Sequence, residues 1–355
     1  MSVVVSVVIP VCLADPTTVS DTLESCLNQT FKDYEILLVD NNAPKNTLMA
    51  MEPYVQLHRE KVRLVKEPRQ GACSARNRGI LEAKGQYVAL LDDDDMMYSH
   101  RLEAQLSAAE RHPEAALIHS LFDRASRDNR QILTKGAAGS PEFWRKLLFE
   151  PDSRLATVPT VLPSVMFFKR DTAIGAGLFD EEFNPQLAEE TEFCLRMGEQ
   201  GPFVLVNDAL VRHRTDCDAD GVARSKRDPF IRIRSLDRLY RALRRRFGSQ
   251  KTATTERAFQ KMRAQWLREA SLVLFPYKFG RHRAKYLLRR CLKEDPFDLK
   301  TWKVWLRTWY PSPLWPAALH FDEWIHEPLP ENLDPQFLES IFSSDPACFH
   351  REASG

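Results

Sequence analysis

The sequence predicts an α/β protein with a largely parallel sheet, followed by a helical extension. The first 120 residues alternate short β-branched runs with amphipathic stretches, which is the pattern of such sheets. Three of the runs, residues 2–11, 34–40 and 87–92, are almost continuously apolar, as expected of strands that are buried on both faces. From residue 228 onward the pattern becomes helical and basic.

The remaining elements follow from periodicity and capping signals. Asp15 or Thr17 can cap the first helix, and Gly85 ends the third. We expect helices over residues 17–29, 47–58, 71–84, 99–111 and 187–200, and further strands over 62–66, 115–123, 159–169 and 203–211. In the basic segment we expect helices within 231–247, 256–275 and 283–292.

The charge is unevenly distributed along the 355 residues, although the formal net charge is only +1. Residues 1–220 carry 24 Lys and Arg against 34 Asp and Glu, residues 221–310 carry 25 against 7, and residues 311–355 carry 1 against 8. A length of 355 residues suggests about two domains. We therefore expect an acidic α/β domain over 1–220, a basic helical extension over 221–310, and an acidic, irregular tail over 311–355.

The cysteines and apolar runs indicate the compartment. Seven scattered cysteines without a C-x-x-C pair argue against a disulfide framework and a zinc site. The longest apolar run, residues 3–14, is broken by Pro10 and is shorter than the roughly 20 residues of a membrane span. No basic residue precedes it, as one would in a signal peptide. We expect a cytoplasmic protein.

The strongest chemical signal is LDDDD, residues 91–95, at the end of a buried strand. Aspartates spaced D-x-D can share a divalent cation, which in turn bridges the phosphates of a nucleotide. An exposed acidic turn is the alternative. Just upstream, GACSARNRG (residues 71–79) begins a helix whose Arg76 can offset the carboxylates, although by itself Arg76 could equally lie on an ordinary helix surface.

These blocks resemble family 2 of the nucleotide-sugar glycosyltransferases, which have the GT-A fold, a Rossmann-like mixed sheet flanked by helices. The matching pieces lie in the family's order across roughly residues 2–215. They are SVVIPV, TLESCLNQTFKDYEILLVDN, GACSARNRG, LDDDD, GLFDEEF and AEETEFCLRM.

The resemblance implies a donor site. Pro10 and Val11 would line the base pocket, Asp40 would hydrogen-bond the base, commonly uracil, and Arg76 would lie near Asp40 and the first carboxylates. Gly71 belongs to the same donor-binding set. Asp92 and Asp93 would face the ribose and the donor sugar.

The resemblance also implies a metal site. Asp94 would bind Mn²⁺ or Mg²⁺ on the diphosphate, and His213 would complete the site or contact the diphosphate. Asp95 is the reserve metal ligand, because a run of four aspartates leaves the D-x-D register open, or else a helix cap. A lone histidine such as His213 is more often structural.

The chain departs from the family pattern in two places. Cys12-Leu13 replaces the usual Tyr-Asn type of pair after Pro-Val, and residues 40–43 read Asp-Asn-Asn-Ala where the family often has Asp-Asp-Gly-Ser. Because of both changes, the resemblance does not determine the identity of the donor base and sugar.

Family members usually invert the sugar by direct displacement, which requires a general base near the acceptor hydroxyl. The family's Glu-Asp pair reads Glu189-Glu190 here, so Glu190 is the candidate base and Glu189 would orient it or contact the acceptor. The alternative is a solvated acidic helix start that the helix dipole favours.

The basic segment has two interpretations. Its mixture of arginines with Leu and Ile suits an anionic membrane surface, or its apolar faces pack while its charges pair with the acidic domain. Nucleic acid is not expected, because no recognition motif is present and the acidic edge would repel phosphates.

The sequence therefore predicts a metal-dependent, inverting glycosyltransferase that moves a sugar from a nucleoside diphosphate sugar, chiefly a UDP-sugar, to a glycan or lipid-linked hydroxyl. It would lie in the cytoplasm or peripherally at the inner face of the membrane. A non-catalytic nucleotide-sugar-binding or scaffold protein is the alternative. A nucleotidyltransferase would usually show a Gly-rich basic N-terminal loop, which the sequence lacks.

Overall fold

The structure is a computed structural model. It describes residues 3–12, 14–126, 128, 131–138, 158–184, 188–214, 238–239, 241–246, isolated positions between 257 and 271, and 280–307. The chain divides into two compact units, Met1–Phe259 and Gln260–Gly355. The domain boundaries expected at residues 220 and 310, and the tail over 311–355, lie outside the described residues.

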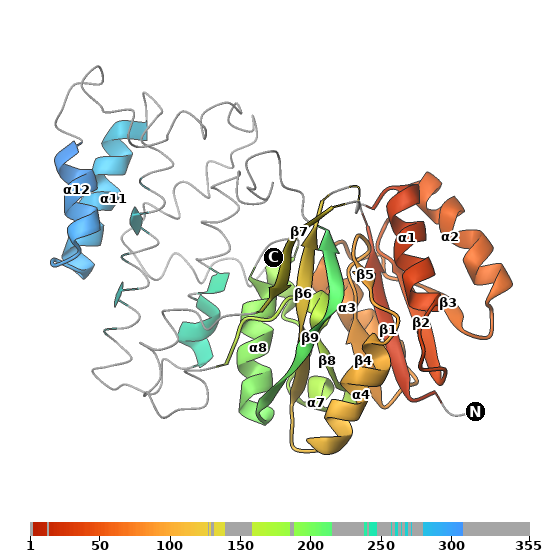
Figure 1. The fold of residues 1–355 in the computed structure, drawn as a ribbon. Coiled ribbons are helices and arrows are strands. Elements are labelled where there is room, and N and C mark those ends of the chain that lie inside the picture. The colour runs from red at the N-terminus through yellow and green to blue at the C-terminus, as the bar shows by residue number, and fades with distance from the viewer. Residues whose placement is uncertain are drawn as a thin grey trace, which may run out of the picture. The chain divides into compact units, whose positions relative to one another are not determined.

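The first unit is built on one mixed sheet (Figure 1). In its described part the strand order is β3-β2-β1-β4-β8-β6-β9-β5, and β7 pairs with β6. The strands β1 to β4 run parallel, whereas β8 is antiparallel to both β4 and β6. The strands are β1 (Val5–Val11), β2 (Tyr34–Asp40), β3 (Val62–Lys66), β4 (Tyr87–Leu90), β5 (Met96–Met97), β6 (Leu117–Ala125), β7 (Ile132–Ala137), β8 (Phe167–Lys169) and β9 (Phe203–Arg214).

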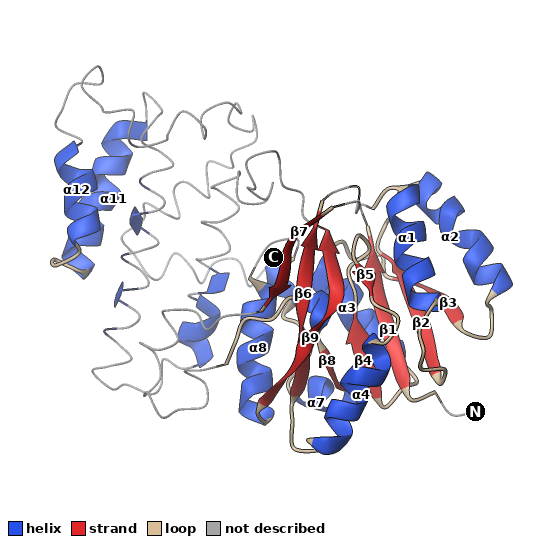
Figure 2. Ribbon diagram, in the orientation of Figure 1, coloured by secondary structure: helices blue, strands red, loops and turns tan. Residues whose placement is uncertain are grey.

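Helices flank both faces of this sheet (Figure 2). They are α1 (Pro16–Leu27), α2 (Lys45–Leu57), α3 (Ala72–Glu82), α4 (Arg101–Arg111), α7 (Arg170–Gly175) and α8 (Glu189–Gln200), with short 3-10 turns η1 (Pro163–Val165) and η2 (Glu181–Phe183). Asp15 caps α1, because its Oδ1 accepts hydrogen bonds from the backbone N–H groups of Thr17 and Thr18.

The centre of the sheet explains its continuous apolar runs. Every residue of β1 and β2 is buried. Pro10 has no N–H to donate, and it lies just beyond the last pairing of β1 with β4, which joins Val8 to Leu90. The proline therefore costs the sheet no ladder hydrogen bond toward β4.

The expected strand over residues 159–169 is wrong for most of its length. Residues 163–165 form η1 and only Phe167–Lys169 pair as β8. Pro159 and Pro163 lack the N–H groups that a ladder needs, which favours irregular backbone before β8. The short strand β5 and the strand β7 have no clear signal in the sequence.

The described part of the expected helix over residues 231–247 is helical and packs within the first unit. Leu239 and Leu243 are buried there. Arg245 pairs with Glu182 at 2.6 Å, and Arg246 pairs with Glu199. Here the apolar face packs and the arginines pair with acidic residues of the α/β domain, as the second interpretation of the basic segment expects.

The second unit contains α11 (Gly280–Glu294) and α12 (Leu299–Arg307). Ala284, Leu287, Leu288 and Cys291 bury one side of α11. None of the helices in the described ranges combines the length and apolar character that crossing a membrane requires.

Candidate active site

The carboxyl ends of β1, β2 and β4 bring the first predicted residues together at one edge of the sheet. Val11 pairs with Asp40 at the ends of β1 and β2. The Asp93 carboxylate accepts hydrogen bonds from the backbone N–H of Cys12 at 2.9 Å and of Ala14 at 3.3 Å. The acidic run, residues 92–95, therefore lies directly against the loop that follows β1, where open α/β sheets bind ligands.

The predicted base pocket is only partly open. Val11 is fully buried, and Asp40 is 8% exposed. Asp40 Oδ1 accepts a hydrogen bond from the backbone N–H of Ala43 at 3.0 Å. Its second oxygen accepts no hydrogen bond from any described residue, so this oxygen is available to a ligand.

Arg76 links the acidic run to the start of α8. Its Nη2 donates to Asp92 Oδ1 at 2.8 Å and its Nη1 donates to Glu189 Oε1 at 2.9 Å. The guanidinium is buried, and although burial opposes its charge, Asp92 and Glu189 raise the pKa of Arg76. Its hydrogen bonds to described residues do not include Asp40, near which the resemblance places it.

Glu189 and Glu190 begin α8 directly after Ala188, which has a left-handed φ of 85°. A non-glycine residue in this region stores strain of about 1–3 kcal/mol, which is typical of functional sites. Burial, followed by the neighbouring Glu189 carboxylate, raises the pKa of Glu190 to about 8. A carboxyl group with such a pKa becomes able to accept a proton as the pH approaches 8.

The last two aspartates of the acidic run have different surroundings. Asp95 is fully buried, and its carboxylate accepts a hydrogen bond from the backbone N–H of Arg214 at 2.8 Å and lies 3.1 Å from His213 Nδ1. No described residue donates a hydrogen bond to the Asp94 carboxylate. Burial and the like charges of Asp95 and Asp92 raise the pKa of Asp94 to about 8. The Asp95 carboxylate is thus already hydrogen-bonded within the protein, whereas the Asp94 carboxylate remains available to a cation.

One ring nitrogen of His213 is already in contact with a protein group. Its ring meets Phe122 edge-on, with 5.7 Å between the ring centroids, and its Nδ1 faces Asp95. Burial opposes the charged form, but Asp95 outweighs it and raises the pKa of His213 to about 9. Only Nε2 is left for a ligand. Within the described residues no three His, Cys, Asp or Glu side chains form a metal-binding group.

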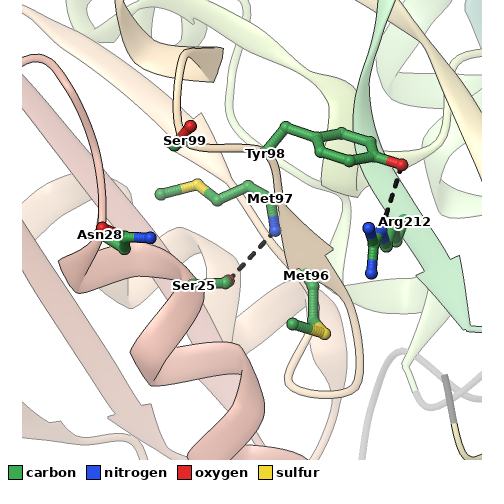
Figure 3. Close-up of a pocket in the computed structure, with 7 residues that line it drawn as sticks. All are labelled: Ser25, Asn28, Met96, Met97, Tyr98, Ser99 and Arg212. Atoms are coloured by element: carbon green, nitrogen blue, oxygen red, sulfur yellow. Dashed lines mark hydrogen bonds between the residues drawn. The ribbon is translucent and has the colours of Figure 1, made fainter. Parts of the chain in front are cut away.

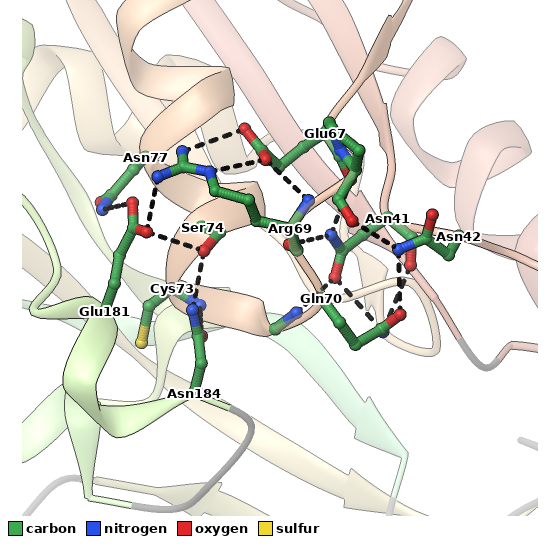
Figure 4. A network of polar contacts seen from close by, with 12 residues as sticks. Asn41, Asn42, Glu67, Arg69, Gln70, Cys73, Ser74, Asn77, Glu181 and Asn184 are labelled. Atoms are coloured by element: carbon green, nitrogen blue, oxygen red, sulfur yellow. Dashed lines mark hydrogen bonds and ion pairs between the residues drawn. The ribbon is translucent and has the colours of Figure 1, made fainter. Parts of the chain in front are cut away.

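A polar network behind the donor edge includes residues that sequence reasoning missed (Figure 4). Asn41 is buried, and its amide binds three backbone groups, the carbonyls of Glu67 and Arg69 and the N–H of Gly71. This amide fixes the loop that leads into α3. The Asn41 position appeared in the sequence only as part of a departure from the family pattern.

The same network fixes the segment that precedes α8. Asn184 Oδ1 accepts a hydrogen bond from the backbone N–H of Cys73 at 2.9 Å, and Glu181 Oε2 lies 3.0 Å from Ser74 Oγ. Gly71 has a φ of 136°, and a Cβ at this position would lie 2.2 Å from Asn184 atoms. Gly71 is therefore required here for its backbone conformation and for the close approach of Asn184.

A separate pocket of about 220 Å³ lies between the end of α1 and β5 (Figure 3). Arg212 contacts the Tyr98 hydroxyl at 3.1 Å at its edge. The pocket contains none of the predicted donor or catalytic residues. Its lining residues are Ser25, Asn28, Met96, Met97, Tyr98, Ser99 and Arg212.

The sequence of the α/β unit matches the model of a known family, described as Glycosyl transferase family 2, over residues 6–173. We call the matched residues 6–173, a little under half of the chain, the family 2 region. The family 2 region thus extends from β1 through β8 and contains the acidic run and Arg76.

Curated relatives of the family 2 region are glycosyltransferases. The uncharacterized glycosyltransferase EpsJ of Bacillus subtilis is 27% identical over 197 residues, which are 54% of this chain and 55% of the relative. An uncharacterized glycosyltransferase of Rickettsia bellii is 25% identical over 54% of this chain and 25% of its own length. The Escherichia coli protein WfgD, named a UDP-Glc:alpha-D-GlcNAc-diphosphoundecaprenol beta-1,3-glucosyltransferase, is 32% identical over 104 residues, 29% of this chain and 40% of its own. The chain thus spans about half or less of these relatives.

A solved structure shows the same fold. The crystal structure of S. aureus TarS 1–349 in complex with UDP matches with a TM-score of 0.51 at 14% identity, covering 86% of this chain and 91% of that chain. The expected GT-A fold, a mixed sheet flanked by helices, is confirmed.

Proposed function

We propose that the protein is a glycosyltransferase that moves a sugar from a nucleoside diphosphate sugar to a hydroxyl group. The observation that carries this proposal is the buried bridge of Arg76 between Asp92 and Glu189. One guanidinium ties the acidic run to the helix start that holds the candidate base, so donor and acceptor chemistry would share one rigid frame.

The proposed donor is a UDP-sugar. The fold is shared with a protein crystallised with UDP, and the name of one E. coli relative contains UDP-Glc. The free oxygen of Asp40 at the end of β2 is suited to accept a hydrogen bond from a base N–H. Asp92 and Asp93 are proposed to face the ribose and sugar, although Asp93 also orders the loop after β1.

The proposed metal dependence rests on Asp94. Its carboxylate is surrounded by like charges and accepts no hydrogen bond from a described residue, which suits Mn²⁺ or Mg²⁺. When bound, the cation would neutralise the diphosphate leaving group. We place His213 beside it as a contact to the diphosphate, because its charged form is favoured by Asp95.

The proposed chemistry is a direct displacement. Glu190 would take the proton of the acceptor hydroxyl while the acceptor oxygen attacks the anomeric carbon of the donor. The bond between that carbon and the phosphate oxygen breaks and the nucleoside diphosphate leaves. The configuration at the anomeric carbon is inverted. Glu189 holds its place through Arg76 and keeps the pKa of Glu190 high.

The proposed acceptor is a glycan or a lipid-linked glycan, as in the name of the E. coli relative. We propose in addition that the part of the basic segment after residue 259 brings the protein to an anionic membrane surface, because basic residues there outnumber acidic ones.

A panel of nucleoside diphosphate sugars tests this function, with release of nucleoside diphosphate as the readout. We expect one UDP-sugar to support turnover with Mn²⁺ or Mg²⁺ and none to do so in EDTA. Tight donor binding without turnover for every donor and several glycan acceptors would favour the non-catalytic alternative.

A further inference from the structure

The helix α12 presents an apolar face outward. Leu299, Trp302 and Leu306 are 73%, 39% and 54% exposed, and their spacing of three and four residues places them on one side of the helix. The preceding Phe297 is 87% exposed. On the opposite side, Thr301 is fully buried. We call Phe297, Leu299, Trp302 and Leu306 the outer face of α12.

Polar contacts hold Trp302 of the outer face and the start of α12. Trp302 Nε1 donates to the carbonyl of Pro296 at 2.7 Å, and the Trp302 ring meets Trp305 edge-on with 5.6 Å between centroids. Asp298 caps the helix, because its Oδ1 accepts the backbone N–H of Lys300 and its Oδ2 accepts the Thr301 hydroxyl. These contacts hold the Trp302 ring and the first turn of the helix in place, and exposed apolar patches mark interaction surfaces.

Positive charge borders this face. Lys303 is exposed and, four residues after Leu299, lies beside it on the helix surface, and Lys300 is exposed one residue after Leu299. Residues 260–307 contain 13 Lys and Arg against 4 Asp and Glu. A helix with Trp and Leu on one side and lysines beside them has the chemistry of helices that lie in the plane of an anionic bilayer.

We propose that the outer face of α12 docks on an anionic lipid surface. The lysines attract the negatively charged headgroups, and the side chains of Phe297, Leu299, Trp302 and Leu306 enter the boundary between headgroups and acyl chains. An apolar protein groove would not need the lysines, so the charge favours lipid over a second copy of the chain. This inference specifies the surface for the membrane association proposed above and rests on it, but not on the catalytic proposal.

Vesicle sedimentation with the full chain tests the proposal. Vesicles of phosphatidylcholine alone are compared with vesicles that contain about 30% phosphatidylglycerol. The first variant combines Leu299→Ser with Leu306→Ser, and the second combines Lys300→Glu with Lys303→Glu. The matched control combines Leu57→Ser with Lys84→Glu, because Leu57 is 78% exposed and Lys84 is exposed on the first unit. Thermal unfolding and circular dichroism verify that each variant is folded.

We expect the wild type and the control to bind the anionic vesicles about tenfold better than neutral ones, and both test variants to lose most of that binding. High salt should release the wild type. Equal binding to neutral vesicles, or wild-type binding by the leucine variant, overturns the proposal. Self-association without vesicle binding, lost in the leucine variant, would overturn it in favour of a second copy. Turnover of a soluble acceptor, measured in parallel, reports on the catalytic proposal separately.

Discussion

Arg76 Nη1 donates to Glu189 Oε1 at 2.9 Å, although 113 residues separate the two side chains along the chain. Both are nearly excluded from solvent. The second nitrogen of the same guanidinium holds Asp92, so this one residue sets the distance between the acidic run and the start of α8.

Replacing Arg76 with Gln should damage both stability and catalysis. The change leaves buried Glu189 without its cation, which typically costs about 3 kcal/mol. It also frees α8 to shift, and a misplacement of about 1 Å can cost about 100-fold in turnover. Chemical denaturation and nucleoside diphosphate release measure the two effects.

Arg78→Gln on the same helix removes only an exposed pair with Glu82, and we expect it to change stability by less than about 1 kcal/mol. Equal effects of the two substitutions would contradict this assignment.

The pH dependence of turnover should follow Glu190. Its pKa of about 8 means that the group is protonated, and unable to accept a proton, below that pH. We therefore expect kcat/KM to rise about tenfold per pH unit below pH 8 and to level off above it.

The same shift affects stability with a definite sign. The folded pKa of Glu190 lies above its ordinary value of 4.5, so ionisation opposes folding and stability declines as pH rises from about 4.5 toward about 8. Glu190→Gln should remove both the rise of kcat/KM with pH and this decline in stability. Glu199→Gln, at the other end of α8, should keep them. If kcat/KM of Glu190→Gln still rises tenfold per pH unit below pH 8, Glu190 is excluded as the base.

Asp94 and Asp95 should respond oppositely to substitution by Asn. Asp94→Asn removes a carboxylate crowded by like charges, so it should raise the melting temperature by a few degrees and abolish metal-dependent nucleotide binding. Asp95→Asn breaks the contact with His213 and weakens that with the Arg214 N–H, and should cost about 1–3 kcal/mol. Differential scanning fluorimetry with and without Mn²⁺ distinguishes them. Metal-dependent binding that is retained in Asp94→Asn and lost in a folded Asp95→Asn would move the D-x-D register by one residue.

Gly71→Ala tests the packing of η2 and the segment after it against α3. The new methyl would collide with Asn184 and the backbone would be strained at a φ of 136°, so we expect a loss of about 2 kcal/mol or more. Gly175→Ala is the matched control, because a Cβ at Gly175 meets nothing within 4 Å. It should leave stability unchanged or raise it by up to about 1 kcal/mol. Similar denaturation midpoints for the two variants would contradict the role assigned to Gly71.

The central strands were predictable because burial on both faces leaves a continuous apolar run, as in β1 and β2. The acidic run was predictable as the end of β4 for the same reason. The strand over residues 159–169 was not, because an apolar composition hides the effect of two prolines on the ladder.

The contacts of the site were predictable only in part. Arg76 lies one element upstream of the acidic run, and this position predicts that it offsets the carboxylates. Its hydrogen bond to Glu189, 113 residues away along the chain, depends on where the fold places α8. The roles of Asn41 and Asn184 are of this second kind. The Asn41 amide binds the backbone of the distant loop before α3, and the Asn184 amide binds the backbone N–H of Cys73 in α3, contacts for which a single sequence carries no periodic signal.

The most direct test of the proposed mechanism compares Glu190→Gln with the wild type in two measurements on one preparation, calorimetric binding of a nucleoside diphosphate sugar with Mn²⁺ and release of nucleoside diphosphate in the presence of acceptor. We predict that the variant binds the donor within about threefold of the wild type and loses at least about 100-fold in turnover, the range expected when a general base is removed. Turnover equal to that of the wild type would contradict the account.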